Sequence, residues 1–185
     1  MGRTPFARLV SVDGVQMPDS QGSSRTLALV RMATGVFFLF FGEYKLIPSP
    51  NGLSNGVAQG YMKHFVQDGS AVAFYGEFLK SVVLPHDVLF TFVVGLGELL
   101  IGLSLVLGLW VRAASVGGVV HMVSLTLATW HSVGSHPALW RYFGSQLSHI
   151  PMLFLFVLFF AGNAGQTWGI DGLRRRRGRQ TARRE

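Results

Sequence analysis

Four long blocks of hydrophobic residues alternate with shorter polar segments along the chain, at about 27–47, 88–110, 113–130 and 147–162. Each block approaches the roughly 17–25 apolar residues that a helix needs to cross about 30 Å of hydrocarbon. The blocks lack the strict polar–apolar alternation of membrane β-strands. The pattern therefore predicts an all-α membrane protein, a four-transmembrane-helix bundle that occupies residues 27–163.

The segments outside the four blocks differ in character. The first 26 residues are polar and rich in Gly and Ser, which predicts a disordered tail, and residues 164–185 form a basic tail. The loop 48–87 between the first two blocks contains "VAQGYMKHFVQ" and "AVAFYGEFLKSVVLP", which mix aromatic residues with scattered charge. Such segments favour helices that lie along a membrane surface. We therefore expect an amphipathic loop on the outer side between helices 1 and 2.

Composition agrees with a membrane protein. Only 14% of the 185 residues are charged and 49% are hydrophobic, whereas roughly a quarter of the residues in a soluble domain are charged. The net charge of +7 could suggest a nucleic-acid partner. Much of it, however, lies in the final "RRRRGRQTARRE", and no basic face interleaved with aromatic residues occurs elsewhere. We therefore predict no nucleic acid, and contact between the arginine-rich tail and anionic lipid.

The distribution of lysine and arginine predicts the orientation, because these residues are enriched in short cytoplasmic segments. With four spans, both tails and the tight turn at Arg112 lie on one side, and the opposite side carries few basic residues, offset by acids. Both termini are therefore expected in the cytoplasm, in a multi-pass protein of the cell (inner) membrane. The basic residues on the side of the tails are Arg3, Arg8, Arg25, Arg112, Arg174, Arg175, Arg176, Arg177, Arg179, Arg183 and Arg184, and those on the other side are Lys63, Lys80 and Arg141.

One acid interrupts the second block, "VVGLGELLIGLSLVLGLWVR", at Glu98. A charge at the centre of a bilayer costs about 2.5–3.5 kcal/mol even on insertion scales, so Glu98 needs a partner or a function. His121 in the third block lies about as far beyond the turn at Val111 as Glu98 lies before it, so that the two share a level near the midplane. The pair is either a polar clasp between two helices or a site that handles protons or a ligand.

The other polar residues leave alternatives open. Glu43 and Lys45 lie at the outer end of the first block, where anchoring at the interface and a function are both compatible with the pattern. Arg31 is expected to extend to lipid phosphates. Five of the six histidines fall at the outer boundary without the i, i+4 spacing that places two ligands on one helix face, so we predict no metal. Among them His149, at the start of the fourth block, is the one most suited to a ligand.

The chain contains no cysteine. This excludes thiol–disulfide exchange, a thiolate nucleophile and Fe–S clusters held by cysteine thiolates.

Three stretches resemble the DoxX/DoxD family of small four-helix membrane proteins. "LVRMATGVFFLFFGEYKL" is similar to the first span of the family, "GLGELLIGLSLVLGLWVRAAS" to the second, and "AGNAGQTWGID" to its glycine-rich close with a terminal aspartate, here Asp171. Some members are small subunits of thiosulfate:quinone oxidoreductases and others belong to redox-stress complexes. The resemblance matches Arg31, Gly42 and Lys45 in the first span, and Glu98 and Arg112 in the second.

The first functional hypothesis is an integral membrane subunit of a quinone-linked oxidoreductase with a second protein subunit. Glu98 would deliver protons and His121 would hydrogen-bond to a quinone oxygen as the catalytic pair. The residues expected to contribute to quinone binding are Glu43, Lys45, Arg112 and His149. The alternative is a non-enzymatic membrane scaffold that recruits a soluble partner enzyme. A small-molecule transporter is a third hypothesis, which the absence of paired discontinuous helices weakens.

Overall fold

The computed structural model describes residues 20–50, 52–53, 56–131 and 146–182. Within these ranges the chain is almost entirely helical, and its β structure is a two-residue antiparallel pair, β1 (Pro48–Ser49) with β2 (Gly52–Leu53). The predictions for the first 19 residues and for Arg141 concern positions outside the described residues.

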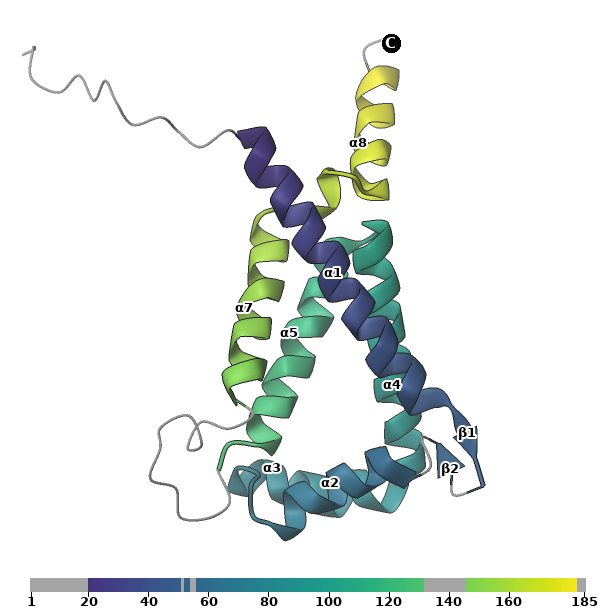
Figure 1. Ribbon diagram of the computed structural model, residues 1–185, viewed down its shortest axis with the longest axis vertical. Helices are drawn as coiled ribbons and strands as arrows, with labels where there is room; N and C mark the ends of the chain where they lie inside the picture. The colour runs from purple at the N-terminus through teal and green to yellow at the C-terminus, as the bar shows by residue number, and fades with distance from the viewer. Residues whose placement is uncertain (1–19, 51, 54–55, 132–145, 183–185) are drawn as a thin grey trace, which may run out of the picture.

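Four helices form the body of the molecule: α1 (Ser20–Leu46), α4 (Asp87–Leu107), α5 (Val111–Ala128) and α7 (Gln146–Ala161). In Figure 1, α4, α5 and α7 follow the long axis, and α1 crosses them obliquely. By length and composition α1, α4 with its upstream extension, and α5 could each cross a membrane, whereas α7 is a shorter apolar helix of 16 residues. The helical membrane-protein character predicted from the sequence is confirmed.

The first helix begins earlier than its apolar block. α1 starts at Ser20, inside the segment predicted as a disordered tail. Once a helix has nucleated, each further residue adds a backbone hydrogen bond at little cost, so the polar residues before Leu27 continue it. Hydrophobicity thus located the apolar part of α1 but not the residue at which the helix begins.

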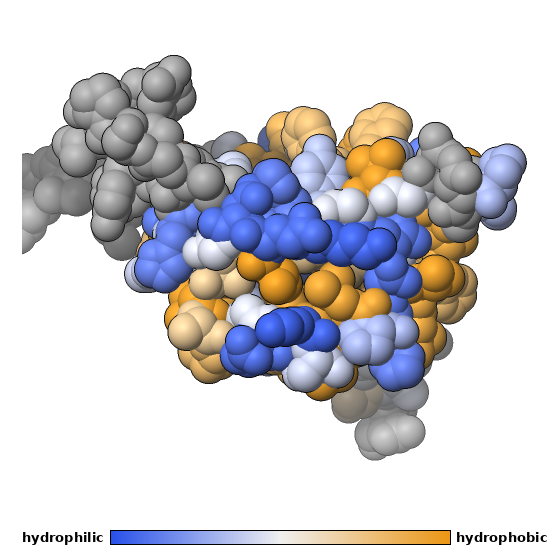
Figure 2. Space-filling model, turned by 90° about the horizontal axis from the view of Figure 1, so that it is seen from below, coloured by the Kyte–Doolittle hydropathy of each residue, from blue (hydrophilic) through white to orange (hydrophobic). Residues whose placement is uncertain are grey.

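A second layer lies across one end of the bundle, formed by α2 (Val57–Gln67) and α3 (Ala73–Phe78) (Figure 1). The chain continues from α3 through a π-helical turn, Leu79–Val83, and a 3₁₀ turn, Leu84–His86, directly into α4. Buried apolar side chains of this layer pack against Ala128 at the end of α5. Figure 2 looks onto this end and shows hydrophilic residues spread over it with hydrophobic ones between them. This end of the molecule thus carries both polar and apolar side chains at its surface.

Two glycines on each partner bring α1 and α4 into close contact. A Cβ atom at Gly35 would lie 2.9 Å from the carbonyl oxygen of Gly102, and one at Gly42 would lie 2.7 Å from that of Gly95. Gly35 and Gly42 are seven residues apart on α1, and Gly95 and Gly102 are seven residues apart on α4. Seven residues make about two turns of helix, so the two contacts lie along one antiparallel line, which we call the glycine seam. Small residues allow this approach in a membrane, where no hydrophobic force drives helices together.

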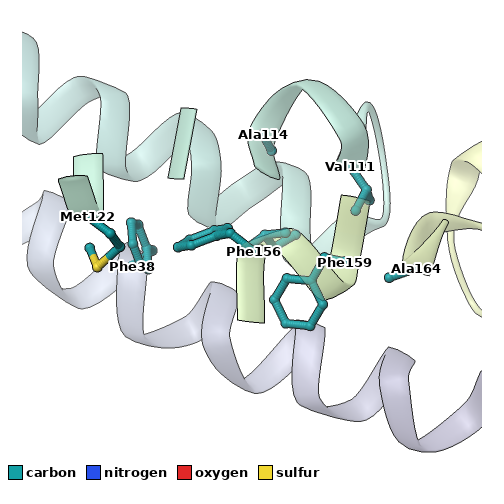
Figure 3. Packing of buried hydrophobic residues seen from close by; sticks show 8 residues of the cluster. Phe38, Val111, Ala114, Met122, Phe156, Phe159 and Ala164 are labelled. Atoms are coloured by element: carbon teal, nitrogen blue, oxygen red, sulfur yellow. The ribbon is translucent and has the colours of Figure 1, made fainter. Parts of the chain in front are cut away.

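The main core lies between α1, α5 and α7. The ring of Phe156 on α7 packs edge-on against Phe38 of α1, with centroids 5.2 Å apart, and sits against Gly118 of α5 (Figure 3). Met122 and Phe159 extend this cluster in the two directions along the bundle. The contact between Phe156 and Gly118 fixes how α7 lies along α5.

The last helix, α8 (Ile170–Thr181), is attached at the end of the bundle opposite to α2 and α3 (Figure 1). The carboxylate of Asp171 accepts hydrogen bonds from the backbone N–H groups of Trp110 and Val111, at 3.0 and 3.1 Å. These N–H groups belong to the start of α5 and have no partner within the helix. The N–H of Asp171 donates in turn to the carbonyl of Gly108. Asp171 therefore caps α5 from a distant part of the chain.

The predicted position of Arg31 is wrong. Its side chain is fully buried and donates hydrogen bonds to the carbonyl oxygens of Ala164 and Trp168, at 3.0 and 3.2 Å, instead of extending to lipid phosphates. The segment between α7 and α8 folds back over the guanidinium and supplies these acceptors. Arg31 therefore fastens the C-terminal segment to α1.

Candidate functional site: a lysine, a glutamate and a histidine inside the bundle

Glu98 lies on the stripe of α4 that faces the interior of the bundle. The buried residues of α4 recur every three or four positions, which is the spacing of one helix face, and Glu98 is one of them. They are Thr91, Gly95, Glu98, Gly102 and Leu105. The side chain of Glu98 is only 5% exposed, so the carboxylate depends on protein partners.

Lys45 is the first of these partners. Its ammonium Nζ lies 2.6 and 2.9 Å from the two carboxylate oxygens of Glu98. Because Gly42 and Gly95 bring the two backbones together, the Cβ of Lys45 sits beside Gly95, one turn from Glu98. The aliphatic stem spans that turn, and the ammonium also lies 5.6 Å from the ring centroid of Phe41. The close approach of the two helices at the glycine seam thus allows the side chain of Lys45 to reach Glu98.

His121 on α5 is the second partner. Its Nε2 lies 2.9 Å from Oε1 of Glu98, so the predicted meeting of these two residues is present in the structure. Since Lys45 already pairs with the carboxylate, we assign the proton of the neutral imidazole to Nε2, donating to Glu98. No described residue forms a hydrogen bond with Nδ1, and Phe38 packs edge-on against the ring.

The three residues form what we call the Lys45–Glu98–His121 cluster. Glu98 lies at its centre and accepts from both neighbours, while Lys45 and His121 keep 21% and 16% of their side chains accessible. A carboxylate that holds an imidazole by one nitrogen orients the ring and stabilises its protonated form. The arrangement can therefore present a proton donor or acceptor at Nδ1, next to a fixed positive charge.

Sequence comparison places the chain in a family. The model of the family described as "TQO small subunit DoxD" matches residues 26–184. The chain belongs to the DoxD family. No curated protein and no solved structure gives a significant match.

The residues that carry the family resemblance have distinct positions in this DoxD-family chain. Lys45 and Glu98 form the ion pair of the cluster, and Gly42 permits the close approach that supports it. Arg31 lies toward the other end of the bundle, where it holds the C-terminal segment. Arg112 is also outside the cluster: its guanidinium stacks over Phe160, 4.4 Å from the ring centroid.

The remaining predicted site residues do not join the cluster. Glu43 is exposed on α1 and forms no ion pair with a described residue. The Nδ1 of His149 lies 3.3 Å from the hydroxyl oxygen of Thr129, the residue that follows α5. Among the described residues no group of three His, Asp, Glu or Cys side chains could hold a metal ion.

Sequence reasoning identified Glu98 with His121 but left Lys45 without its partner. Lys45 is close to the end of α1, whereas Glu98 is in the middle of α4, so a simple comparison of depth separates them. The available signal is the shared seven-residue spacing of Gly35 with Gly42 and of Gly95 with Gly102. Aligning these pairs antiparallel places Lys45 opposite Phe92, about 9 Å along the axis from Glu98, and the long lysine side chain, which leans toward the start of α1, extends toward the carboxylate.

Proposed function

We propose that the chain is the membrane-integral subunit of a quinone-linked oxidoreductase of the thiosulfate:quinone type, with the quinone headgroup bound at the Lys45–Glu98–His121 cluster. Membership of the DoxD family supports the reaction class. The observation that carries the site is a buried carboxylate that holds one partly accessible cation and one partly accessible imidazole.

The donors of the cluster fit a quinone. A quinone has two carbonyl oxygens that accept hydrogen bonds and an apolar ring, and its reduction takes up two electrons and two protons. His121 can direct an N–H group outward from Nδ1, whereas the ammonium of Lys45 donates to both oxygens of Glu98 and to the carbonyl of Phe41 and acts on the quinone through its charge. The rings of Phe38 and Phe41 provide apolar surface beside them. A few polar groups within a mostly apolar lining are typical of small-molecule sites.

We assign the proton transfer to His121 and not to Glu98, which the sequence alone suggested as the proton donor. Glu98 is nearly inaccessible and its oxygens are already engaged. Protonated His121 donates from Nδ1 to a quinone oxygen while Glu98 stabilises the imidazolium. Lys45 lowers the energy of negative charge that develops on the quinone. In this proposal the electrons come from thiosulfate by way of the partner subunit.

The same proposal places the protein in the cell (inner) membrane with four membrane crossings, of which α7 is the fourth. Both termini then lie in the cytoplasm. Trp110 and Trp168 are exposed at the end that carries α8, and tryptophan is enriched at the membrane–water boundary. The exposed arginines of α8 then lie close above the headgroups, where contact with anionic lipid stabilises binding by about 1 kcal/mol per residue. A reporter fused after the C-terminus should be active only in the cytoplasm; activity outside would reverse the orientation.

The decisive experiment measures thiosulfate-dependent reduction of a short-chain quinone by the complex that co-purifies with the chain in mild detergent. His121→Gln removes the basic nitrogen, and we expect kcat to fall on the order of 10²-fold or more, the usual contribution of a positioned acid or base. The matched control is His64→Gln, because His64 is exposed on α2 and paired with Asp68. If His121→Gln keeps full activity, the cluster is not the reaction site. If His121→Gln keeps full activity while Glu98→Gln loses the co-purifying partner subunit, the scaffold function replaces the enzymatic one.

A further inference from the structure

His149 is a second histidine inside the helical body that the proposed reaction does not use. It lies one turn into α7 from the end covered by α2 and α3, and it is half-buried. Its position relative to His121 and the direction of its hydrogen bond both bear on how protons reach the Lys45–Glu98–His121 cluster.

The packing of α7 on α5 places the two histidines one helical turn apart. Phe156 lies against Gly118, and the helices are antiparallel neighbours (Figure 1). Counting back from this contact, His149 is level with Leu125, which is four residues, or about 6 Å, beyond His121 along the axis. His149 therefore lies between the cluster and the end of the bundle that is covered by α2 and α3, opposite to α8 (Figure 1).

The hydrogen bonds of Thr129 define which nitrogen of His149 is free. The Thr129 hydroxyl donates to the carbonyl of Leu125 at 2.8 Å. A hydroxyl has one proton, so at its 3.3 Å contact with His149 it accepts from Nδ1. Neutral His149 then carries its proton on Nδ1 and exposes a basic lone pair at Nε2. Neutral His121, held through Nε2, has its basic lone pair at Nδ1.

Polar groups continue from His149 toward that end of the bundle. The hydroxyl of Ser70 donates to the carbonyl of Ala128, and the side-chain amide of Gln146 donates to the carbonyl of Trp130. Ser70 and Gln146 are buried. Buried polar side chains between apolar helices provide partners for water and for protons that a purely hydrophobic contact would exclude.

We propose that His149 is a proton-transfer residue, which relays protons to His121 from the aqueous side opposite to the chain termini. The inference rests on the proposed function and specifies the side of the membrane from which the reaction takes its protons. In each turnover the quinone receives two electrons from thiosulfate, through the partner subunit, and two protons, and becomes quinol. His121 loses a proton to a quinone oxygen, and His149 returns one to His121 and is reprotonated from water on that side. The sequence runs twice in each turnover, so that the relay supplies both protons of the quinol.

The test compares His149→Asn and His149→Ala with the unmodified chain in the co-purified complex. Asparagine keeps an N–H donor for Thr129 but has no basic nitrogen, so its packing is conserved while proton transfer is lost. We expect both variants to lower kcat on the order of 10²-fold with an unchanged KM for a short-chain quinone. Added imidazole should restore the activity of His149→Ala. His64→Asn is the control and should behave as the unmodified chain.

Sidedness is measured in proteoliposomes with the termini facing inward, using pH-sensitive dyes inside or outside the vesicles. Proton uptake from the outer medium during quinone reduction supports the relay, and uptake from the lumen overturns it. Full activity of His149→Asn also overturns it, because that variant separates a hydrogen-bonding role from proton transfer. If His149→Asn is active while His121→Gln is not, the relay alone fails. If both are active, the proposed function fails as well.

Discussion

Replacing Lys45 by methionine tests the physical basis of the Lys45–Glu98–His121 cluster. The substitution keeps the length and apolar character of the stem but removes the charge that lies 2.6 Å from Glu98. Two unit charges about 4 Å apart attract by about 4 kcal/mol at an effective dielectric constant of about 20. Breaking a buried pair by removing one partner costs about 3–5 kcal/mol, because the remaining charge stays desolvated.

Two features of the cluster place Lys45→Met at the lower end of that range. Lys45 is 21% exposed, so it loses less solvation on folding than a fully buried lysine. His121 remains as a donor to Glu98 and, when protonated, replaces part of the lost charge. We therefore expect the free energy of unfolding to fall by about 3 kcal/mol, which corresponds to a factor of about 100 in the unfolding equilibrium constant.

The assay is equilibrium unfolding in mixed micelles, followed by the loss of helical circular dichroism. Adding Glu98→Gln to Lys45→Met removes the unpaired charge, so the double variant should be more stable than Lys45→Met alone. Lys63→Met is the matched control: Lys63 is 55% exposed and 3.8 Å from Asp87, and a surface pair of this kind contributes about 0–1 kcal/mol. Equal losses for Lys45→Met and Lys63→Met would refute the view of Glu98 as a desolvated charge.

Two further predictions concern the packing of the helices, both measured by the same unfolding assay. Gly42→Ala places a Cβ 2.7 Å from backbone atoms of α4, so the helices must separate and the free energy of unfolding should fall by about 1–3 kcal/mol. Gly97→Ala is the control, because a Cβ there meets no atom within 4 Å, and its free energy of unfolding should stay unchanged or rise by up to about 1 kcal/mol. A neutral Gly42→Ala would contradict the glycine seam. Asp171→Ala removes the acceptors of two backbone N–H groups at the start of α5, so the free energy of unfolding should fall by about 1–3 kcal/mol. Faster tryptic cleavage in α8 would show that this helix is released. An unchanged cleavage rate would mean that other contacts hold α8.

The order of residues alone predicts the helices and singles out the most unusual residue of the interior. Hydrophobic length is a local property, so it identified the apolar parts of α1, α4, α5 and α7 without any knowledge of packing. The cost of a charge in hydrocarbon is equally general, and it singled out Glu98. Because the turn between α4 and α5 is short, only residues at a similar depth on α5 can lie beside Glu98, and His121 is at that depth.

Which residues meet from helices that are distant in the chain depends on how those helices pack. The tilt of α1 and the glycine seam with α4 bring Lys45 to Glu98, and no local pattern contains the angle at which two helices cross. Arg31 is buried only because residues more than 130 positions later fold back over it. Hydrophobicity is a property of each segment alone, whereas the partner of a buried charge is a property of the assembled bundle.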